Sequence, residues 1–326
     1  MKGYKALNMD MSSKYGDMTY KLLEKYTISG NLVPCKNSYH FCENLEDIEN
    51  YYTISKSRIF EVKTEGKMII DEDKICAESI ILLRELSKEE IRQYFEDNQE
   101  RILVKDWNCR KALADQGICL DILVHDKDWR VRTAVAEQGY GLDILIHDKD
   151  CDVRAAVAGQ NYGLNILTHD ENCDVRAAVA EQNYGLDILI HDEDWRVRRA
   201  VAEQGYGLDV LIKDKDPAVR AAVVQQGYGL DILIHDDDGR VREAVAKRGY
   251  GLNILVHDED LWVRAAVAKQ GYGLDILVND EDWHVRRVVA EQGYGLDILV
   301  NDEDWYVRRA VTEHGYGLDI LVHDKD

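Results

Sequence analysis

The chain has 326 residues, of which 45% are hydrophobic and 32% charged, a composition that supports a folded core and excludes a disordered chain. Its 62 acidic residues outnumber its 41 basic residues, and the net charge of -21 disfavours nucleic acid and anionic membrane surfaces as partners. No apolar run reaches the roughly 18 residues of a membrane span, and residues 1–16 have no signal-peptide pattern. We therefore expect a cytoplasmic protein without a membrane segment.

Residues 1–100 do not share the regular pattern of the rest of the chain, and they are predicted to form a small α+β domain. Strands are expected at 3–7, 57–66 and 77–86, and a strand entering a helix is expected within 37–52. A helix is expected at 87–97, because Ser87 and Glu90 have the spacing of a capping box.

The segment SYHFCENLEDIENYY, followed by RIFEVKTEG, resembles a part of the ADP-ribosyltransferases in which an aromatic-rich strand and a helix grip nicotinamide. On that alignment His40 takes the place of the stacking tyrosine, Tyr51 that of the helix tyrosine, and Glu85 or Glu78 that of the late glutamate. The pair Tyr4-Lys5 departs from the family, which has a cofactor-gripping His or Arg there. The segment also resembles uncharacterised domains at the front of bacterial and phage proteins, which imply no known activity. An inactive or unrelated capping domain is therefore favoured over an active transferase.

From about residue 101 the chain repeats every 22 residues, which gives ten units. One alignment column contains only arginine: Arg110, Arg132, Arg154, Arg176, Arg198, Arg220, Arg242, Arg264, Arg286 and Arg308. A period of this length is typical of a solenoid in which each unit packs on its neighbours. Residues 101–326 are therefore predicted to form a mostly α-helical solenoid.

Each unit contains the signals of one longer and one shorter helical segment. In the unit that begins at Asp128, this aspartate can cap a helix of about ten residues that ends at Gly139. Val131, Ala134 and Val135 would form the buried stripe of that helix. The following LDILI is predicted to be a short α or 3-10 segment, and a strand remains the alternative.

The VRxAVA and LDIL motifs in a 22-residue frame resemble the leucine-rich repeat variant family, and also short HEAT-type repeats. The first resemblance implies a right-handed superhelix of paired α and 3-10 helices, and the second a stack of α-helix pairs. The founding member of the variant family carries a cysteine-bound iron–sulfur cluster, but no close cysteine run precedes the repeats of this chain. We expect no cofactor.

The arginine column allows two readings, an anion-binding row or a ladder of Asp–Arg pairs between adjacent units. The ladder is favoured because each arginine has several nearby acids, such as Asp121, Asp126 and Asp128 around Arg132. The HDKD-type loops contain possible calcium or zinc ligands, but Lys213, Asn279 and Asn301 interrupt their histidine column. We predict no metal site and no catalytic residues.

The column directly after the capping aspartate, which is the first position of the predicted helix, accepts very different side chains. This variation indicates an edge rather than a packed core. The column contains Trp107, Trp129, Cys151, Cys173, Trp195, Pro217, Gly239, Leu261, Trp283 and Trp305. Because tryptophan and arginine are common in binding hot spots, we predict a recognition strip. Its residues are Trp129, Arg130, Trp195, Arg196, Arg199, Trp283, Arg287, Trp305 and Arg309. The alternative is that each indole only covers the backbone of the preceding unit.

The expected function is a non-catalytic repeat scaffold that binds a protein partner. The competing hypothesis is an NAD-using, ADP-ribosyltransferase-like enzyme in residues 1–100, with the repeats as a targeting module, and a third is a structural spacer. The sequence shows no polar terminal cap at Asp326, so this end is expected either to continue in the natural protein or to self-associate.

Overall fold

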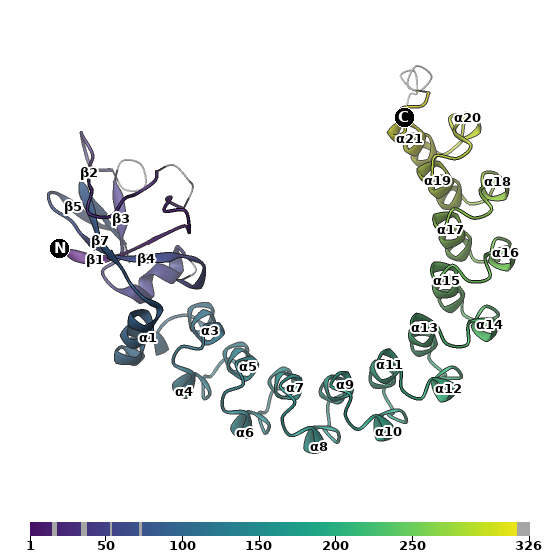
Figure 1. The fold of residues 1–326 in the computed structure, drawn as a ribbon, viewed down its shortest axis with the longest axis horizontal. Helices are drawn as coiled ribbons and strands as arrows, with labels where there is room; N and C mark the ends of the chain where they lie inside the picture. The colour runs from purple at the N-terminus through teal and green to yellow at the C-terminus, as the bar shows by residue number, and fades with distance from the viewer. Residues whose placement is uncertain (15–17, 34–37, 53, 72–73, 318–326) are drawn as a thin grey trace. The chain divides into compact units, whose positions relative to one another are not determined.

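The computed structural model describes residues 1–14, 18–33, 38–52, 54–71 and 74–317 of the chain. A small β-rich domain precedes helices that follow one another in a repeated order, which confirms the predicted fold class (Figure 1). The chain forms two compact units, Met1–Tyr162 and Gly163–Asp326, and the division between them falls within the repeats.

Seven strands among the described residues form two antiparallel sheets in the first unit. The larger sheet has the order β1 (Lys2–Leu7), β4 (Arg58–Lys63), β7 (Ser79–Glu85) and β2 (Lys25–Thr27). The smaller sheet has the order β3 (Tyr39–Phe41), β6 (Lys74–Ala77) and β5 (Met68–Asp71). The strands predicted from the sequence correspond to β1, β3, β4 and β7. The strands β2, β5 and β6, of three or four residues each, were not predicted.

The two sheets meet where β1 approaches the end of β3. Tyr4 and Cys42 exchange backbone hydrogen bonds, with N···O distances of 2.7 and 2.8 Å. Gly3 permits this approach, because a β-carbon there would collide with the carbonyl oxygen of Cys42 and with the Phe41 ring. The core between the sheets contains fully buried side chains such as Leu7 and Phe60.

The helix expected after β3 is a 3-10 helix, η1 (Leu45–Asn50), rather than an α-helix. A second 3-10 turn, η2 (Ile54–Lys56), precedes β4. The predicted capping box is confirmed: the Ser87 side chain accepts from the amide of Glu90, and the Glu90 carboxylate accepts from the amide of Ser87. It opens α1 (Lys88–Asp97), which is followed by α2 (Gln99–Leu103).

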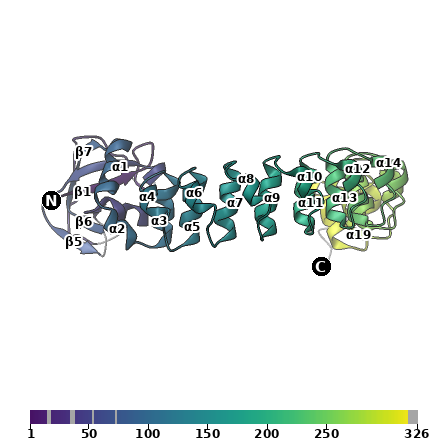
Figure 2. The ribbon, with the colours of Figure 1, turned by 90° about the horizontal axis from the view of Figure 1, so that it is seen from below.

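The repeats alternate nine-residue and four-residue helices. The long helices are α3 (Trp107–Asp115), α5 (Trp129–Glu137), α7 (Cys151–Gly159), α9 (Cys173–Glu181), α11 (Trp195–Glu203), α13 (Pro217–Gln225), α15 (Gly239–Lys247), α17 (Leu261–Lys269), α19 (Trp283–Glu291) and α21 (Trp305–Glu313). The short helices are α4 (Leu120–Leu123), α6 (Leu142–Leu145), α8 (Leu164–Leu167), α10 (Leu186–Leu189), α12 (Leu208–Leu211), α14 (Leu230–Leu233), α16 (Leu252–Leu255), α18 (Leu274–Leu277) and α20 (Leu296–Leu299). In the second unit the long helices line the inner edge of the stack and the short helices its outer edge (Figure 1). Neighbouring long helices, such as α3 and α5 or α9 and α11, lie side by side (Figure 2).

The local signals of the unit act as expected. The Asp128 carboxylate accepts from the amide of Arg130 at 3.0 Å and caps α5. Val131, Ala134 and Val135 are completely buried. The LDIL segment is a short α-helix, so the 3-10 and strand alternatives for it are wrong. A strand is excluded because Gly141, at a φ of +60°, turns the chain into the short helix.

Among the residues that the structure describes, no helix has both the length and the apolar character that a membrane-spanning helix needs. The expected uncapped end of the array falls on residues 318–326, which lie outside the described residues.

Candidate functional site

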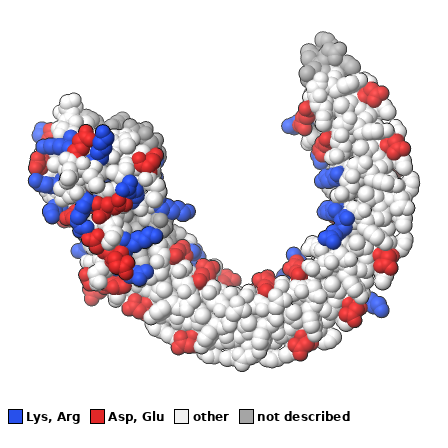
Figure 3. Space-filling view, in the orientation of Figure 1, with Lys and Arg blue, Asp and Glu red and all other residues white. Residues whose placement is uncertain are grey.

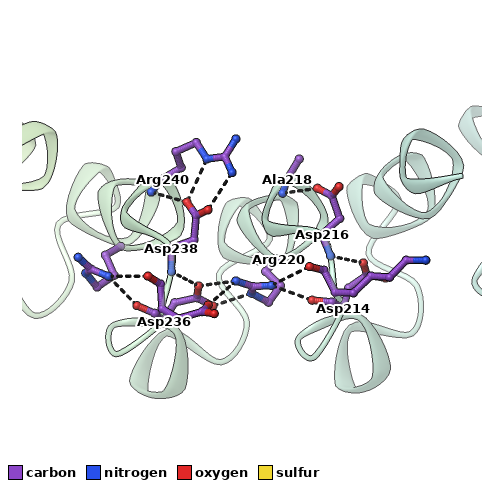
Figure 4. Close-up of polar contacts among 10 residues, drawn as sticks. Asp214, Asp216, Ala218, Arg220, Asp236, Asp238 and Arg240 are labelled. Carbon is purple, nitrogen blue, oxygen red and sulfur yellow. Dashed lines mark hydrogen bonds and ion pairs between the residues drawn. The ribbon is translucent and has the colours of Figure 1, made fainter. Parts of the chain in front are cut away.

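The arginine column forms a ladder that joins consecutive turns of the array. Arg220 donates from Nε and Nη2 to the Asp236 carboxylate at 2.7 and 2.6 Å, and from Nη1 to the carbonyl oxygen of Asp214 at 2.8 Å (Figure 4). The same bidentate pairing, over 16 residues, joins Arg110–Asp126, Arg132–Asp148, Arg176–Asp192, Arg198–Asp214, Arg242–Asp258, Arg264–Asp280 and Arg286–Asp302. This confirms the predicted Asp–Arg ladder.

The acid that pairs with each arginine differs from those expected by proximity in sequence. Arg132 binds the carboxylate of Asp148, whereas Asp126 gives it only a backbone carbonyl oxygen. The Asp126 side chain is instead the partner of Arg110. Asp148 also accepts from the amide of Asp150, at 2.9 Å, and so holds the residue that caps α7.

The ladder is buried and its charges are balanced. The side chains of Arg132 and Asp148 are 7% and 9% exposed. Burial alone would raise the pKa of Asp148, but the hydrogen bonds from Arg132 and from the Asp150 amide outweigh it and hold the pKa below its usual value. An anion-binding row would need exposed, unbalanced guanidinium groups, so this reading of the paired arginines is wrong.

The tryptophans of the predicted recognition strip stand at the first residue of their helices. Trp129 and Trp305 are 39% and 44% exposed, and Trp195 and Trp283 are half-buried. Between Trp195 and Trp283, however, α13 and α15 begin with Pro217 and Gly239. The structure therefore does not bring the tryptophans of the second unit together into one surface, and Trp129 belongs to the first unit.

The arginines of the predicted strip are each paired with an acid of their own helix or its cap. The nitrogen–oxygen distances are 2.7 Å for Arg130–Asp128, 3.2 Å for Arg196–Asp194, 2.8 Å for Arg199–Glu203, 3.2 Å for Arg287–Glu291 and 3.7 Å for Arg309–Glu313. The Arg130 guanidinium also lies 3.5 Å from the ring centroid of Trp107, a residue outside the predicted strip. Because each guanidinium is paired with a carboxylate, these arginines offer little attraction to an acidic partner.

Five rings at the start of α17, α19 and α21 form a continuous surface that we call the aromatic cluster. It consists of Trp262, Trp283, His284, Trp305 and Tyr306. The ring centroids lie 5.4 Å apart for Trp262–His284, 3.5 Å for Trp283–His284, 5.0 Å for Trp283–Tyr306 and 3.9 Å for Trp305–Tyr306. Trp262, Trp305 and Tyr306 are 55%, 44% and 41% exposed.

Trp262, His284 and Tyr306 were not predicted from the sequence as binding residues. They stand in the column directly after the tryptophan column, at the second residue of each long helix, from which only Arg130 and Arg196 entered the predicted strip. Aromatic residues in two adjacent columns of three consecutive units were the signal that could have revealed the cluster.

Exposed carboxylates border the aromatic cluster. Glu259, Glu281 and Glu303 lie in the turns before α17, α19 and α21, and their side chains are 89%, 87% and 91% exposed. Each carboxylate also lies near a ladder arginine, at 3.4, 3.5 and 3.6 Å from Arg242, Arg264 and Arg286. A shallow hollow of about 290 Å³ brings Glu281 and Glu303 to the side of Trp283. In Figure 3 acidic side chains recur along the outer edge of the second unit and several basic side chains lie along its inner edge, whereas the N-terminal domain shows both signs intermixed.

The N-terminal domain contains a cavity of about 770 Å³. It is lined by four residues of the transferase-like alignment, namely Tyr4, Lys5, His40 and Tyr51. The two candidate glutamates do not line it. Glu85 is paired with Arg58 at 2.5 Å, and Glu78 accepts from the amide of Lys67 at 3.0 Å.

One group of possible metal ligands occurs among the described residues. The ligand atoms of Asp150, Cys151 and Asp152 lie within 4.8 Å of one another. The Asp150 carboxylate already accepts from the amide of Asp152, at 3.1 Å, so the arrangement is that of a helix cap.

Residues 1–93 match the model of a family described as "Domain of unknown function (DUF7666)". The match covers the N-terminal domain and not the repeats, and it agrees with the expected resemblance to uncharacterised domains. The chain matches no curated protein.

Proposed function

We propose that the chain is a non-catalytic scaffold whose repeats bind a partner protein, and that the aromatic cluster is the main contact. The observation that carries the proposal is the continuous run of rings across three neighbouring helices, of which Trp262 is 55% exposed. Exposed clusters of tryptophan and tyrosine are typical of binding hot spots, because they bury a large area at a small cost in side-chain entropy.

The partner surface that fits the cluster is a basic segment. Residues 101–326 contain 27 basic and 43 acidic residues, a net charge of -16. The carboxylates of Glu281 and Glu303 lie beside Trp283 and are mostly exposed, although they also lie 3.5 and 3.6 Å from ladder arginines. The nearby Arg287 is paired with Glu291. Lysine or arginine side chains of a partner could lie over the rings and meet these carboxylates, which combines cation–π attraction with charge complementarity.

The six tryptophans of the chain allow a matched test. One variant changes Trp262, Trp283 and Trp305 to Ala, and its control changes Trp107, Trp129 and Trp195 to Ala. Both are checked for an unchanged helical circular dichroism spectrum. The parent chain is used to select peptides from a random library, and the affinity of the selected peptides is then measured for all three proteins.

We expect the selected peptides to be enriched in lysine and arginine. We also expect the variant without the cluster tryptophans to bind them at least about tenfold more weakly than the control variant does, since one hot-spot residue contributes about 2 kcal/mol or more. Selected peptides without a basic bias, or equal affinity for the two variants, would contradict the proposal. A structural spacer would select no peptide at all.

The second candidate function, NAD-using group transfer, has one observation in its favour: His40, Tyr51 and Lys5 line a single cavity. It lacks the carboxylate that such chemistry needs, because Glu78 and Glu85 form their contacts elsewhere. We expect the full chain to release no nicotinamide from NAD above the buffer rate. Release that Glu85→Gln or Glu78→Gln abolishes would favour the transferase instead.

A further inference from the structure

The side chain of Lys5 is a buried cation for which the described residues provide no carboxylate partner. The residue is 8% exposed, and its ammonium donates to the carbonyl oxygen of His40 at 2.8 Å. Among the described residues no carboxylate lies within ion-pair distance of it. Burial lowers the pKa of Lys5 to about 8, so the group is still mostly charged near neutral pH. A buried charge of this kind is costly unless an opposite charge approaches it.

Lys5 stands on the wall of the cavity of about 770 Å³. The same wall contains Lys14, whose ammonium lies over the ring of Tyr52, and Lys74, whose ammonium lies over the ring of Tyr51, and no Asp or Glu is among the described residues that line it. Ser13, which also lines the cavity, has a buried Oγ with no hydrogen-bond partner among the described residues. The Lys5 ammonium and the Ser13 hydroxyl are therefore suited to hold an anion in this cavity.

The rest of the wall is aromatic. Tyr20, Tyr39, Tyr51 and Tyr52 line the cavity, and the rings of Tyr20 and Tyr39 meet edge to face at 6.5 Å. The Lys5 ammonium lies 5.2 Å from the Tyr20 ring centroid, so the cation and the aromatic surface are adjacent. The volume lies within the range of about 300–1,000 Å³ that is usual for small-molecule sites.

We propose that this cavity binds an anion that carries a planar aromatic ring, the chemistry of a mononucleotide, with the anionic group at Lys5 and Ser13 and the ring among the tyrosines. The proposal concerns the N-terminal domain and does not depend on the function proposed for the repeats. It involves binding only and requires no reaction.

The test is isothermal titration calorimetry of the full chain with AMP, GMP, CMP and UMP, and in separate titrations with the corresponding nucleosides and with inorganic phosphate. We expect at least one mononucleotide to bind at least about tenfold more tightly than its nucleoside and than phosphate, because both parts of the ligand contribute. In Lys5→Met we expect that affinity to fall at least about tenfold.

Lys2→Met is the matched control. Lys2 belongs to the same strand, but its side chain is 70% exposed and pairs with Glu61. This variant should bind the mononucleotide as the parent does. If Lys5→Met does not fold, Ser13→Ala provides the second variant, and it should weaken binding several-fold. The proposal is overturned if no mononucleotide binds at millimolar concentration, if nucleoside and nucleotide bind equally, or if the folded variant at Lys5 or Ser13 binds like the parent.

Discussion

Single residues of the repeat have distinct and separable roles. In α11, Arg198 is buried and joins two turns, whereas the next residue, Arg199, is exposed and pairs only within its own helix. The two residue types are identical, but their surroundings differ. The side chains of Arg198 and Asp214 are 6% and 8% exposed, so a change at Arg198 leaves a buried carboxylate without its partner.

We expect Arg198→Met to lower the free energy of unfolding by about 3 kcal/mol, because removing one partner of a buried ion pair leaves the other charge buried and unpaired. Arg199→Met, the control in the same helix, should change it by less than about 1 kcal/mol, as is usual for an exposed pair. Urea unfolding followed by circular dichroism measures both values. An Arg198→Met curve that coincides with that of the parent would refute a stabilising role of the ladder.

At the scale of the helical elements, glycine and aspartate determine where each helix begins and ends. Gly141 opens the short helix α6 at a φ of +60°, and a β-carbon there would lie 2.5 Å from Cγ2 of Val124. Gly159 is itself the last helical residue of α7: its φ is not positive, and no atom lies within 4 Å of the position of its β-carbon. The two glycines therefore predict opposite responses to alanine.

Gly141→Ala is expected to destabilise the first unit by about 1–2 kcal/mol, since alanine is strained in the left-handed conformation and crowds Val124. Gly159→Ala is expected to leave stability unchanged or to raise it by up to about 1 kcal/mol, because alanine favours the helix. Thermal melts of the two variants decide the point. A lower melting temperature for Gly159→Ala, or an unchanged one for Gly141→Ala, would contradict this account of the turns.

Across the molecule, the repeated ion pairs give stability a common dependence on pH. Burial alone would raise the pKa values of Asp148, Asp214 and Asp302, but hydrogen bonds from the ladder arginines and from backbone amides outweigh it, and all three pKa values lie below the ordinary value. A carboxylate with a lowered pKa in the folded state adds stability above its unfolded pKa, which is about 3.9 for aspartate. That contribution disappears as the pH falls through the folded pKa.

We therefore expect the array to keep its stability from about pH 7 to about pH 5 and to lose it steeply below about pH 4. Urea midpoints measured along this range test the expectation. In Arg198→Met the pKa of Asp214 is no longer lowered by its guanidinium, so this variant should lose less stability over the same interval. A midpoint that rises as the pH falls below about 4 would show that the paired carboxylates do not control stability.

The sequence by itself determined the repeat length, the helix ends and the buried stripe, because these depend on local chemistry that recurs in every unit. Aspartate caps such as Asp128, turn glycines such as Gly141 and the Val131–Val135 stripe could be read from neighbouring residues alone. The capping box of Ser87 and Glu90 is local in the same sense.

Only the tertiary structure decided which distant residues meet. It paired Arg132 with Asp148 rather than with the acids nearer in sequence, because the turn between α6 and α7 brings that carboxylate to the guanidinium. It gathered Trp262, Trp283 and Tyr306 from three helices, while Pro217 and Gly239 separate Trp195 from them. It also placed Lys5 beside the ring of Tyr20, on the wall of a cavity that no described Asp or Glu lines. Such meetings depend on how elements pack, which no local pattern of residues specifies.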